Sequence, residues 1–256
     1  MKNSHLFSTI ISQAVLATGL LLGSAVASAA TCVTGGSGEA SLQDTLDNIT
    51  VGGNSSVSAA NDCLSDDLDS SWILDATGGA VTSMIIELAG QATTNTFGVY
   101  ETGDSGNFVQ LFDGAATAGS QATLTIKANG DVLVNQVLEG NFGGTKTFGF
   151  YLGTRKGTFF SNSSLNNDDM SDHLLAYQGT GDLVQLPTFN PGEWNPNEYI
   201  LAWEDLPFGN YKYDGDFNDM VLMIESVQPV PVPAAVWLFG SGLLALVGIA
   251  RRKKVA

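Results

Sequence analysis

The middle of this chain consists of short apolar or alternating runs that recur about every 10 to 15 residues and are separated by Gly, Asn and Asp. Runs of this length are shorter than most helices, and their β-branched and aromatic residues favour strands. Residues 129–131, Asn-Gly-Asp, supply a hairpin turn between two such runs. We therefore predict an all-β fold with a single, jelly-roll-like β-sandwich. The clearest runs are 96–100, 108–112, 122–126, 131–134 and 148–152.

Helix signals are few in the same region. Residues 41–47 are consistent with one short helix. Residues 81–88 are consistent with a helix or a strand. The β-friendly residues in this run and the glycines on both sides of it favour a buried strand.

The C-terminus contains an apolar segment, residues 234–250, that has no charged side chain and is followed by four basic residues, 251–254. Proline disfavours helix in the residue before it, so a helix can begin only after Pro231 and Pro233. The 17 residues of the segment span about 25 Å as a helix, at the short end for a hydrocarbon core of about 30 Å. We predict one transmembrane helix with its basic end in the cytoplasm.

The N-terminus has the features of a secretory signal peptide over residues 1–29. Lys2 provides a basic start, residues 6–23 are mostly apolar, and small residues at 27–29 fit the cleavage rule of signal peptidase. Both ends are therefore set apart from the fold. The remaining residues, 30–228, are enough for one exported domain with its own core.

The C-terminal residues resemble the PEP-CTERM sorting signal of Gram-negative bacteria, which combines a proline motif, a transmembrane helix and an arginine-rich end over residues 229–256. Val232 stands where the family has glutamate. The resemblance implies that an exosortase-type protease cuts an inner-membrane intermediate and passes the domain to the cell surface or outside the cell. An ordinary anchor that is never processed is the alternative. The matching residues are Val230, Pro231, Val232 and Pro233 in the proline motif, with Arg251 and Arg252 in the basic end.

The exported part is strongly acidic. All 26 acidic residues lie between Glu39 and Glu225, where only five basic residues oppose them, so this part has a net charge of −21. Such a surface repels nucleic acid and anionic lipid and attracts divalent cations. The charge is equally consistent with solubility alone, so local spacing has to distinguish the two interpretations.

Cys32 and Cys63 are the only cysteines of the chain. An exported domain meets oxidising conditions, so we predict a disulfide between them. Chain-entropy models give such a link about 3 to 4 kcal/mol of stability. A metal or thiol-catalysis role is disfavoured, because the sequence has no CxxC motif and no Cys/His cluster.

Three segments near the C-terminal end of the domain contain most of its polar chemistry. Residues 164–169 precede His173, residues 199–206 end in Trp-Glu-Asp-Leu, and residues 214–221 read Asp-Gly-Asp-Phe-Asn-Asp-Met-Val. This order resembles the family DUF4114 over about residues 90–226. The resemblance leaves the biochemical role open, although such domains occur in bacterial surface and sorted proteins.

Asp214, Asp216 and Asn218 place oxygen atoms at positions 1, 3 and 5 of a turn, the spacing of calcium-binding loops. An EF-hand is excluded, because Asp219 stands where that loop needs Gly and residues 220–224 favour a strand over an exiting helix. A calcium site on a strand-loop-strand frame remains open, with Glu204 and Asp205 as further ligands from the preceding strand. The plain alternative is a hairpin turn at Asp214 and Gly215, in which Asn218 and Asp219 bind local backbone N–H groups.

Catalytic motifs are missing from the sequence. His173 is the only histidine outside the signal peptide, and no nucleophile elbow, Walker loop or His-Glu-x-x-His pair is present. A lone histidine of this kind is more often a structural hydrogen-bonding residue. Aromatic residues near the acidic loop are consistent with sugar stacking or with ordinary core strands: Trp194, Tyr199, Trp203, Tyr211 and Tyr213.

We expect a non-enzymatic, calcium-stabilised protein of the cell surface or extracellular matrix, with a structural or adhesive role or an association with exopolysaccharide. The alternative is a carbohydrate-binding lectin or glycan-active enzyme in the same compartment, because two carboxylates suffice for a glycosidase. Signal peptidase and an exosortase-type protease are the expected processing partners, and no nucleic acid is expected.

Overall fold

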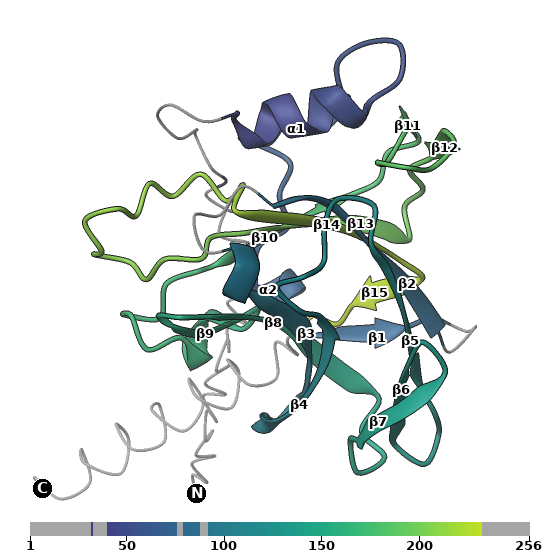
Figure 1. Cartoon of the computed structure of the whole chain (residues 1–256), viewed down its shortest axis with the longest axis vertical. Helices are drawn as coiled ribbons and strands as arrows, with labels where there is room; N and C mark the ends of the chain where they lie inside the picture. Colours follow the sequence, from purple (N-terminus) through teal and green to yellow (C-terminus); the bar gives the residue numbers. More distant parts are fainter. Residues whose placement is uncertain (1–31, 33–39, 76–78, 88–91, 232–256) are drawn as a thin grey trace, which may run out of the picture.

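The computed structural model describes residues 32, 40–75, 79–87 and 92–231, which form mostly β-strands in open sheets with few helices (Figure 1). The all-β class is therefore confirmed. One sheet contains β2 (Gly79–Glu87), β5 (Gln121–Ile126), β6 (Asp131–Val134), β7 (Val137–Asn141), β10 (Leu174–Gln178), β13 (Glu198–Trp203) and β14 (Met220–Glu225). A second contains β1 (Trp72–Leu74), β3 (Thr96–Glu101), β4 (Asp104–Phe112), β8 (Thr147–Thr154), β9 (Gly157–Phe160) and β15 (Val227–Pro229).

The smaller elements are a two-stranded ribbon and four short helices. They are β11 (Leu183–Val184), β12 (Gly192–Glu193), α1 (Leu42–Ile49), α2 (Asp66–Asp69), η1 (Ala92–Thr94) and η2 (Ser163–Leu165). The seven-stranded sheet has the order β10-β13-β14-β2-β5-β6-β7 with antiparallel neighbours. The six-stranded sheet has the order β15-β1-β8-β3-β4, and β9 also pairs with β8.

The two large sheets share one hydrophobic core. Two aromatic pairs cross between them: Trp72 on β1 meets Tyr199 on β13 at 4.9 Å, and Phe97 on β3 meets Trp203 on β13 at 6.1 Å. Both pairs are edge-to-face, an arrangement that adds about 0.5 to 1.5 kcal/mol beyond the area that it buries. Phe150 on β8 stacks on Phe97 within the same core.

Strands β10, β13 and β14 are buried on both faces. Alternate residues of β13 point to different cores: Leu201 and Trp203 belong to the core between the sheets, and Ile200 and Ala202 to a second one that includes α1. In Figure 1, α1 lies on the side of these strands opposite to β3 and β8. Double burial explains why β13 and β14 are uninterrupted apolar runs rather than alternating ones.

Helix α1 forms because its sequence supplies both a cap and an apolar face. The Ser41 hydroxyl accepts from the Asp44 N–H at 3.1 Å, and the Asp44 carboxylate accepts from the Ser41 N–H at 3.0 Å. This capping box satisfies backbone donors that the first turn leaves free. Leu42, Leu46 and Ile49 then lie on one side of the helix and are buried in the second core.

Most strands predicted from the sequence are confirmed. The runs at 96–100, 108–112, 122–126, 131–134 and 148–152 lie in β3, β4, β5, β6 and β8, and residues 81–87 lie in β2. β5 and β6 form the predicted hairpin, with Gly130 in a left-handed conformation at φ +89°. The short helix expected at 41–47 is also present as α1.

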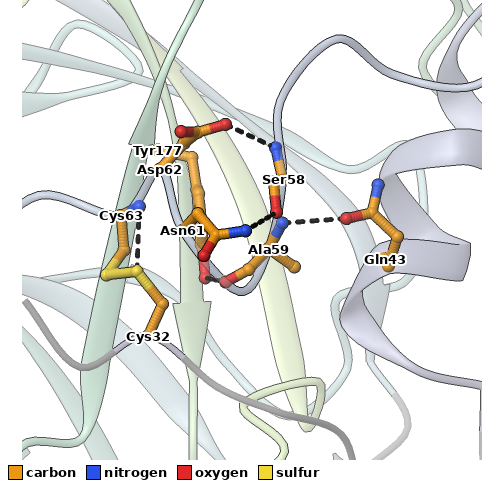
Figure 2. Close-up of a disulfide and its surroundings, with 8 residues drawn as sticks. All are labelled: Cys32, Gln43, Ser58, Ala59, Asn61, Asp62, Cys63 and Tyr177. Atoms are coloured by element: carbon orange, nitrogen blue, oxygen red, sulfur yellow. Dashed lines mark hydrogen bonds between the residues drawn. A yellow bond between two sulfur atoms is a disulfide. The ribbon is translucent and has the colours of Figure 1, made fainter.

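Polar contacts fasten the segment between α1 and α2 to the sheet, and a disulfide links the same segment to Cys32, which precedes α1. Cys32 and Cys63 are bonded, with their Cα atoms 5.8 Å apart. Figure 2 shows the Tyr177 hydroxyl of β10 donating to the Ala59 carbonyl at 2.7 Å, while the Ala59 N–H donates to Gln43 of α1 at 2.8 Å. The Leu64 N–H bonds the Ala176 carbonyl, so this segment covers the outer edge of β10.

The predicted signal peptide, residues 1–29, and the predicted transmembrane helix, residues 234–250, lie outside the described residues. The same holds for Val232, Pro233, Arg251 and Arg252 of the proposed sorting motif. Among the described helices, none has the length and apolar character needed to cross a membrane. Val230 follows β15 directly, and its N–H donates to the Ser71 carbonyl at 2.7 Å.

Candidate metal site

The acidic residues predicted from the sequence lie at one end of two neighbouring strands. β13 ends at Trp203, which pairs with Met220, the first residue of β14. Antiparallel pairing therefore places Glu204 and Asp205, just after β13, beside Asp219, just before β14. The intervening loop returns Asp214 and Asp216 to the same end.

Five carboxylates form two overlapping groups, which we call the loop site. Within each group, one ligand atom from every residue lies within 4.8 Å of the others. Glu204 belongs to both groups and is fully buried, whereas Asp214 is exposed. The loop site thus runs from the protein surface to a buried glutamate. The groups are Glu204, Asp214 and Asp216, and Glu204, Asp205 and Asp219.

Hydrogen bonds from backbone N–H groups and from one side-chain amide orient three of these carboxylates. Glu204 accepts from the N–H groups of Leu206 and Gly215, each at 3.2 Å, and Asp219 accepts from the Asp205 N–H at 2.9 Å. The Asp205 carboxylate accepts from the buried Asn95 amide at 3.0 Å. Such bonds fix the positions of the carboxylates, but they supply no positive charge.

Burial and electrostatic repulsion raise the pKa values of three carboxylates of the loop site, those of Glu204, Asp205 and Asp219. Burial first, and then the nearby charge of Asp219, raise the pKa of Glu204 to about 9. Burial and the charge of Asp205 raise the pKa of Asp219 to about 7, and burial also raises the pKa of Asp205. These shifts mean that ionised carboxylates are unfavourable here without a positive partner.

The ion pair seen among the described residues joins His173 to Asp168, and neither residue belongs to the loop site. The five basic residues of the domain are all exposed: Lys127, Lys146, Arg155, Lys156 and Lys212. A cation bound from solution could neutralise the negative charge of the loop site. Carboxylate oxygens are the ligands preferred by Ca²⁺ and Mg²⁺.

The segment that carries this strand-loop-strand arrangement matches a family model described as domain of unknown function (DUF4114), over residues 117–227. Residues 117–227 form a DUF4114 domain. The match begins later than residue 90, where the sequence motifs had suggested, and it includes the whole loop site. No curated protein matches the chain.

His173 connects two parts of the DUF4114 domain and is fully buried. Its Nδ1 lies 2.9 Å from the Glu204 carbonyl oxygen, and its Nε2 lies 2.7 Å from Asp168 Oδ2. The ring stacks on Phe159 at 3.7 Å. Both ring nitrogens are engaged by acceptors, so these contacts favour the structural role expected for this histidine.

The amide nitrogen of Asn218 is engaged by protein acceptors on two sides. Its amide nitrogen donates to the Ala40 carbonyl at 2.7 Å and to Asp216 at 2.9 Å, which leaves only its oxygen for an ion. Phe217, which lies between Asp216 and Asn218 in the sequence, adopts a left-handed conformation at φ +52° and packs in the second core. A residue other than glycine in this region costs about 1 kcal/mol or more and is commonest at functional sites.

The hairpin turn at Asp214 and Gly215, the alternative to a metal site, is present only in part. Gly215 has a φ of +65°, as the hairpin interpretation expects. Asp219, however, binds the N–H of Asp205, 14 residues away, rather than a neighbour in the turn. Glu225, at the position of the last EF-hand ligand, lies at the far end of β14 opposite Glu198.

The aromatic residues of the DUF4114 domain divide into two groups. Trp194, Tyr199 and Trp203 are buried in the cores, so they cannot stack on a sugar. Tyr211 is 91% exposed, and Phe208, which the sequence did not single out, is 57% exposed. Sequence reasoning also missed Asn95, because its contact with Asp205 joins residues 110 positions apart.

Proposed function

We propose that this protein is an exported, non-enzymatic component of the cell surface or extracellular matrix, built on a jelly-roll-like β-sandwich that calcium stabilises at the loop site. Its role would be structural or adhesive, or an association with exopolysaccharide. The observation that carries the proposal is the buried Glu204, which belongs to two groups of carboxylates whose ligand atoms lie within 4.8 Å of one another.

Calcium is the cation that fits this donor set best. All five side chains offer hard oxygen ligands, and no histidine or cysteine belongs to either group. Calcium accepts several carboxylates in irregular geometry, whereas Mg²⁺ demands near-octahedral geometry and keeps its waters. An ion shared by Glu204 and Asp219 would also remove the repulsion that raises their pKa values.

Export and sorting are supported by the two ends of the described chain. The disulfide between Cys32 and Cys63 is of a kind that persists in oxidising compartments. The last strand, β15, ends at Pro229, immediately before the proline motif that begins at Val230. Cleavage by an exosortase-type protease near this motif would leave the sheets intact. The intact mass of the secreted protein would locate the cut, and a product that retains residues 234–256 would contradict it.

A calcium-dependent lectin is the second candidate, favoured by the exposed aromatic residues beside the loop site. Phe208 and Tyr213 contact each other at 5.6 Å, and Tyr211 lies between them in sequence with most of its surface exposed. Exposed rings can stack on sugars. Glycan-array binding in calcium would support this candidate, and hydrolysis that depends on one carboxylate would instead support an enzyme.

Thermal unfolding with calcium and with EDTA tests the first proposal. A ligand at 100 times its dissociation constant adds about 2.7 kcal/mol. For a domain of this size, that corresponds to a rise in Tm of roughly 5 to 10 °C. Glu204→Gln should lose most of the rise, and Glu139→Gln, at an exposed position on β7, should keep it. An unchanged Tm in calcium would refute the metal site.

A further inference from the structure

A second group of acidic residues lies apart from the loop site in sequence and is centred on Asp69, the last residue of α2. Asp69 has no exposed surface, and neither of its carboxylate oxygens has a hydrogen-bond partner. An unpartnered buried carboxylate is among the costliest groups in a protein, because it has lost its water without replacement. Some ligand or proton must therefore compensate it.

Two further carboxylates are near Asp69, and together we call them the aspartate triad: Asp66, Asp69 and Asp172. Asp66 lies one turn before Asp69 in α2, and Asp172 precedes β10, against which α2 packs. One oxygen of Asp66 accepts from the Ser163 hydroxyl at 2.9 Å, and the other is buried without a partner. The triad thus contains three buried oxygen atoms that no donor satisfies.

The groups around the triad supply little compensation. The Trp72 indole nitrogen lies close by, but it donates to the Asp69 backbone carbonyl at 2.7 Å. The backbone N–H groups of Asp69 and Ala176 lie close enough to lower the pKa of the Asp69 carboxyl, but their geometry falls short of a hydrogen bond with it. Burial, together with the charges of Asp172 and Asp66, raises the pKa of Asp69 well above its usual range.

We propose that the aspartate triad binds a second divalent cation of the calcium class, separate from the loop site. The unpartnered oxygens of Asp69 and Asp66 would be its main ligands, with Asp172 as the third. These carboxylates are spaced more widely than those of the loop site, so the ion would draw Asp66 and Asp172 toward Asp69. Oxygen-only ligands exclude the softer transition metals as preferred occupants.

Such an ion would fasten α2 to the start of β10. α2 begins three residues after Cys63, so the disulfide and the ion would hold successive parts of one segment. Trp72 comes three residues after Asp69 and is fully buried between the sheets. Calcium at the triad would therefore stabilise the entry of the chain into β1.

Calcium content of the purified full chain, measured by elemental analysis after dialysis, tests the second site. Asp69→Asn preserves the shape of the side chain and removes its charge, so this variant should retain one equivalent of calcium fewer than the wild type. Glu204→Gln serves as the matched variant for the loop site. Asp69→Asn that retains as much calcium as the wild type would overturn the inference and leave the loop site standing.

Thermal unfolding of the same variant provides a second test of the site at the aspartate triad. In EDTA, Asp69→Asn should melt at the same temperature as the wild type or higher, because it no longer buries an uncompensated charge. Calcium should raise the Tm of Asp69→Asn by less than it raises the Tm of the wild type. A variant that melts lower in EDTA but has the full calcium-dependent gain would show that Asp69 is structural without a cation. If Asp69→Asn does not fold, Asp172→Asn, at a half-buried position, replaces it with the same expected loss of calcium.

Discussion

The loop site and the aspartate triad both lie beside β10 and β13, but their carboxylates are assembled differently. The loop site comes from a single stretch, Glu204 to Asp219, and its carboxylates accept hydrogen bonds from the backbone of that stretch. The triad joins Asp69 to Asp172 through the packing of α2 on β10, and Asp69 receives no such bond. A loop of consecutive residues brings its own backbone donors. In the triad, Asp66 accepts from Ser163 and Asp172 from the Leu174 N–H, whereas Asp69 lacks such a donor.

His173 lies between the two clusters, and its removal should have the largest effect on stability. Its ring contacts Asp168 and the Glu204 carbonyl, and its neighbour Asp172 belongs to the triad. His173→Ala should lower the free energy of unfolding by about 4 kcal/mol, because it removes two buried hydrogen bonds and leaves a cavity. Denaturant unfolding would measure this loss in calcium and in EDTA. An equal loss in both is expected of a structural residue, whereas loss of the calcium effect would make His173 part of a metal site.

The pH dependence of the calcium-free protein should be the next largest effect. The folded-state pKa of Glu204 is about 9 and its usual value is 4.5, so between these values the folded state binds more protons than the unfolded state. The free energy of unfolding in EDTA should therefore fall as pH rises, by up to about 1.4 kcal/mol per unit from this group. Asp219 adds a contribution of the same sign up to about pH 7.

Glu204→Gln should lack this contribution, and Asp69→Asn should lack the corresponding one from the triad. Urea unfolding in EDTA from pH 5 to pH 8 would compare the two variants with the wild type. As pH rises, the free energy of unfolding of both variants should increase relative to that of the wild type. Parallel curves for Glu204→Gln and the wild type would show that Glu204 ionises as an ordinary surface carboxylate.

Tyr211→Ala should have the smallest effect on stability. The ring is 91% exposed, and the Lys212 ammonium lies 5.9 Å from the ring centre. Substitution at such a site changes stability by about 0.5 kcal/mol or less. We expect unchanged melting and calcium binding, measured side by side with the wild type. Loss of glycan binding in this variant alone would favour the lectin alternative over a purely structural role.

Local patterns made much of this fold predictable. Apolar runs bounded by turn residues identify β3, β5 and β8, and Gly130 marks the hairpin that joins β5 to β6. The sequence did not show that β13 and β14 are covered on both faces, because a continuous apolar run does not reveal what packs on either side. That covering depends on α1, whose partners lie far along the chain.

The candidate sites also differ in whether local sequence or tertiary packing brings their residues together. The spacing of Asp214, Asp216 and Asn218 pointed to a metal site in this loop, and two of the three, Asp214 and Asp216, belong to the loop site. Nothing in the sequence pairs Asp69 with Asp172, since their proximity comes from tertiary packing. The amide of Asn95 at Asp205 escaped prediction for the same reason.

Calorimetric titration of calcium into the calcium-free protein tests the central claim most directly. We expect saturable binding at neutral pH that Glu204→Gln weakens at least tenfold and Glu139→Gln leaves unchanged, since Glu204 belongs to both groups of the loop site. Tenfold corresponds to about 1.4 kcal/mol of binding free energy. Absence of saturable binding, or equal affinity in the wild type and Glu204→Gln, would contradict the account.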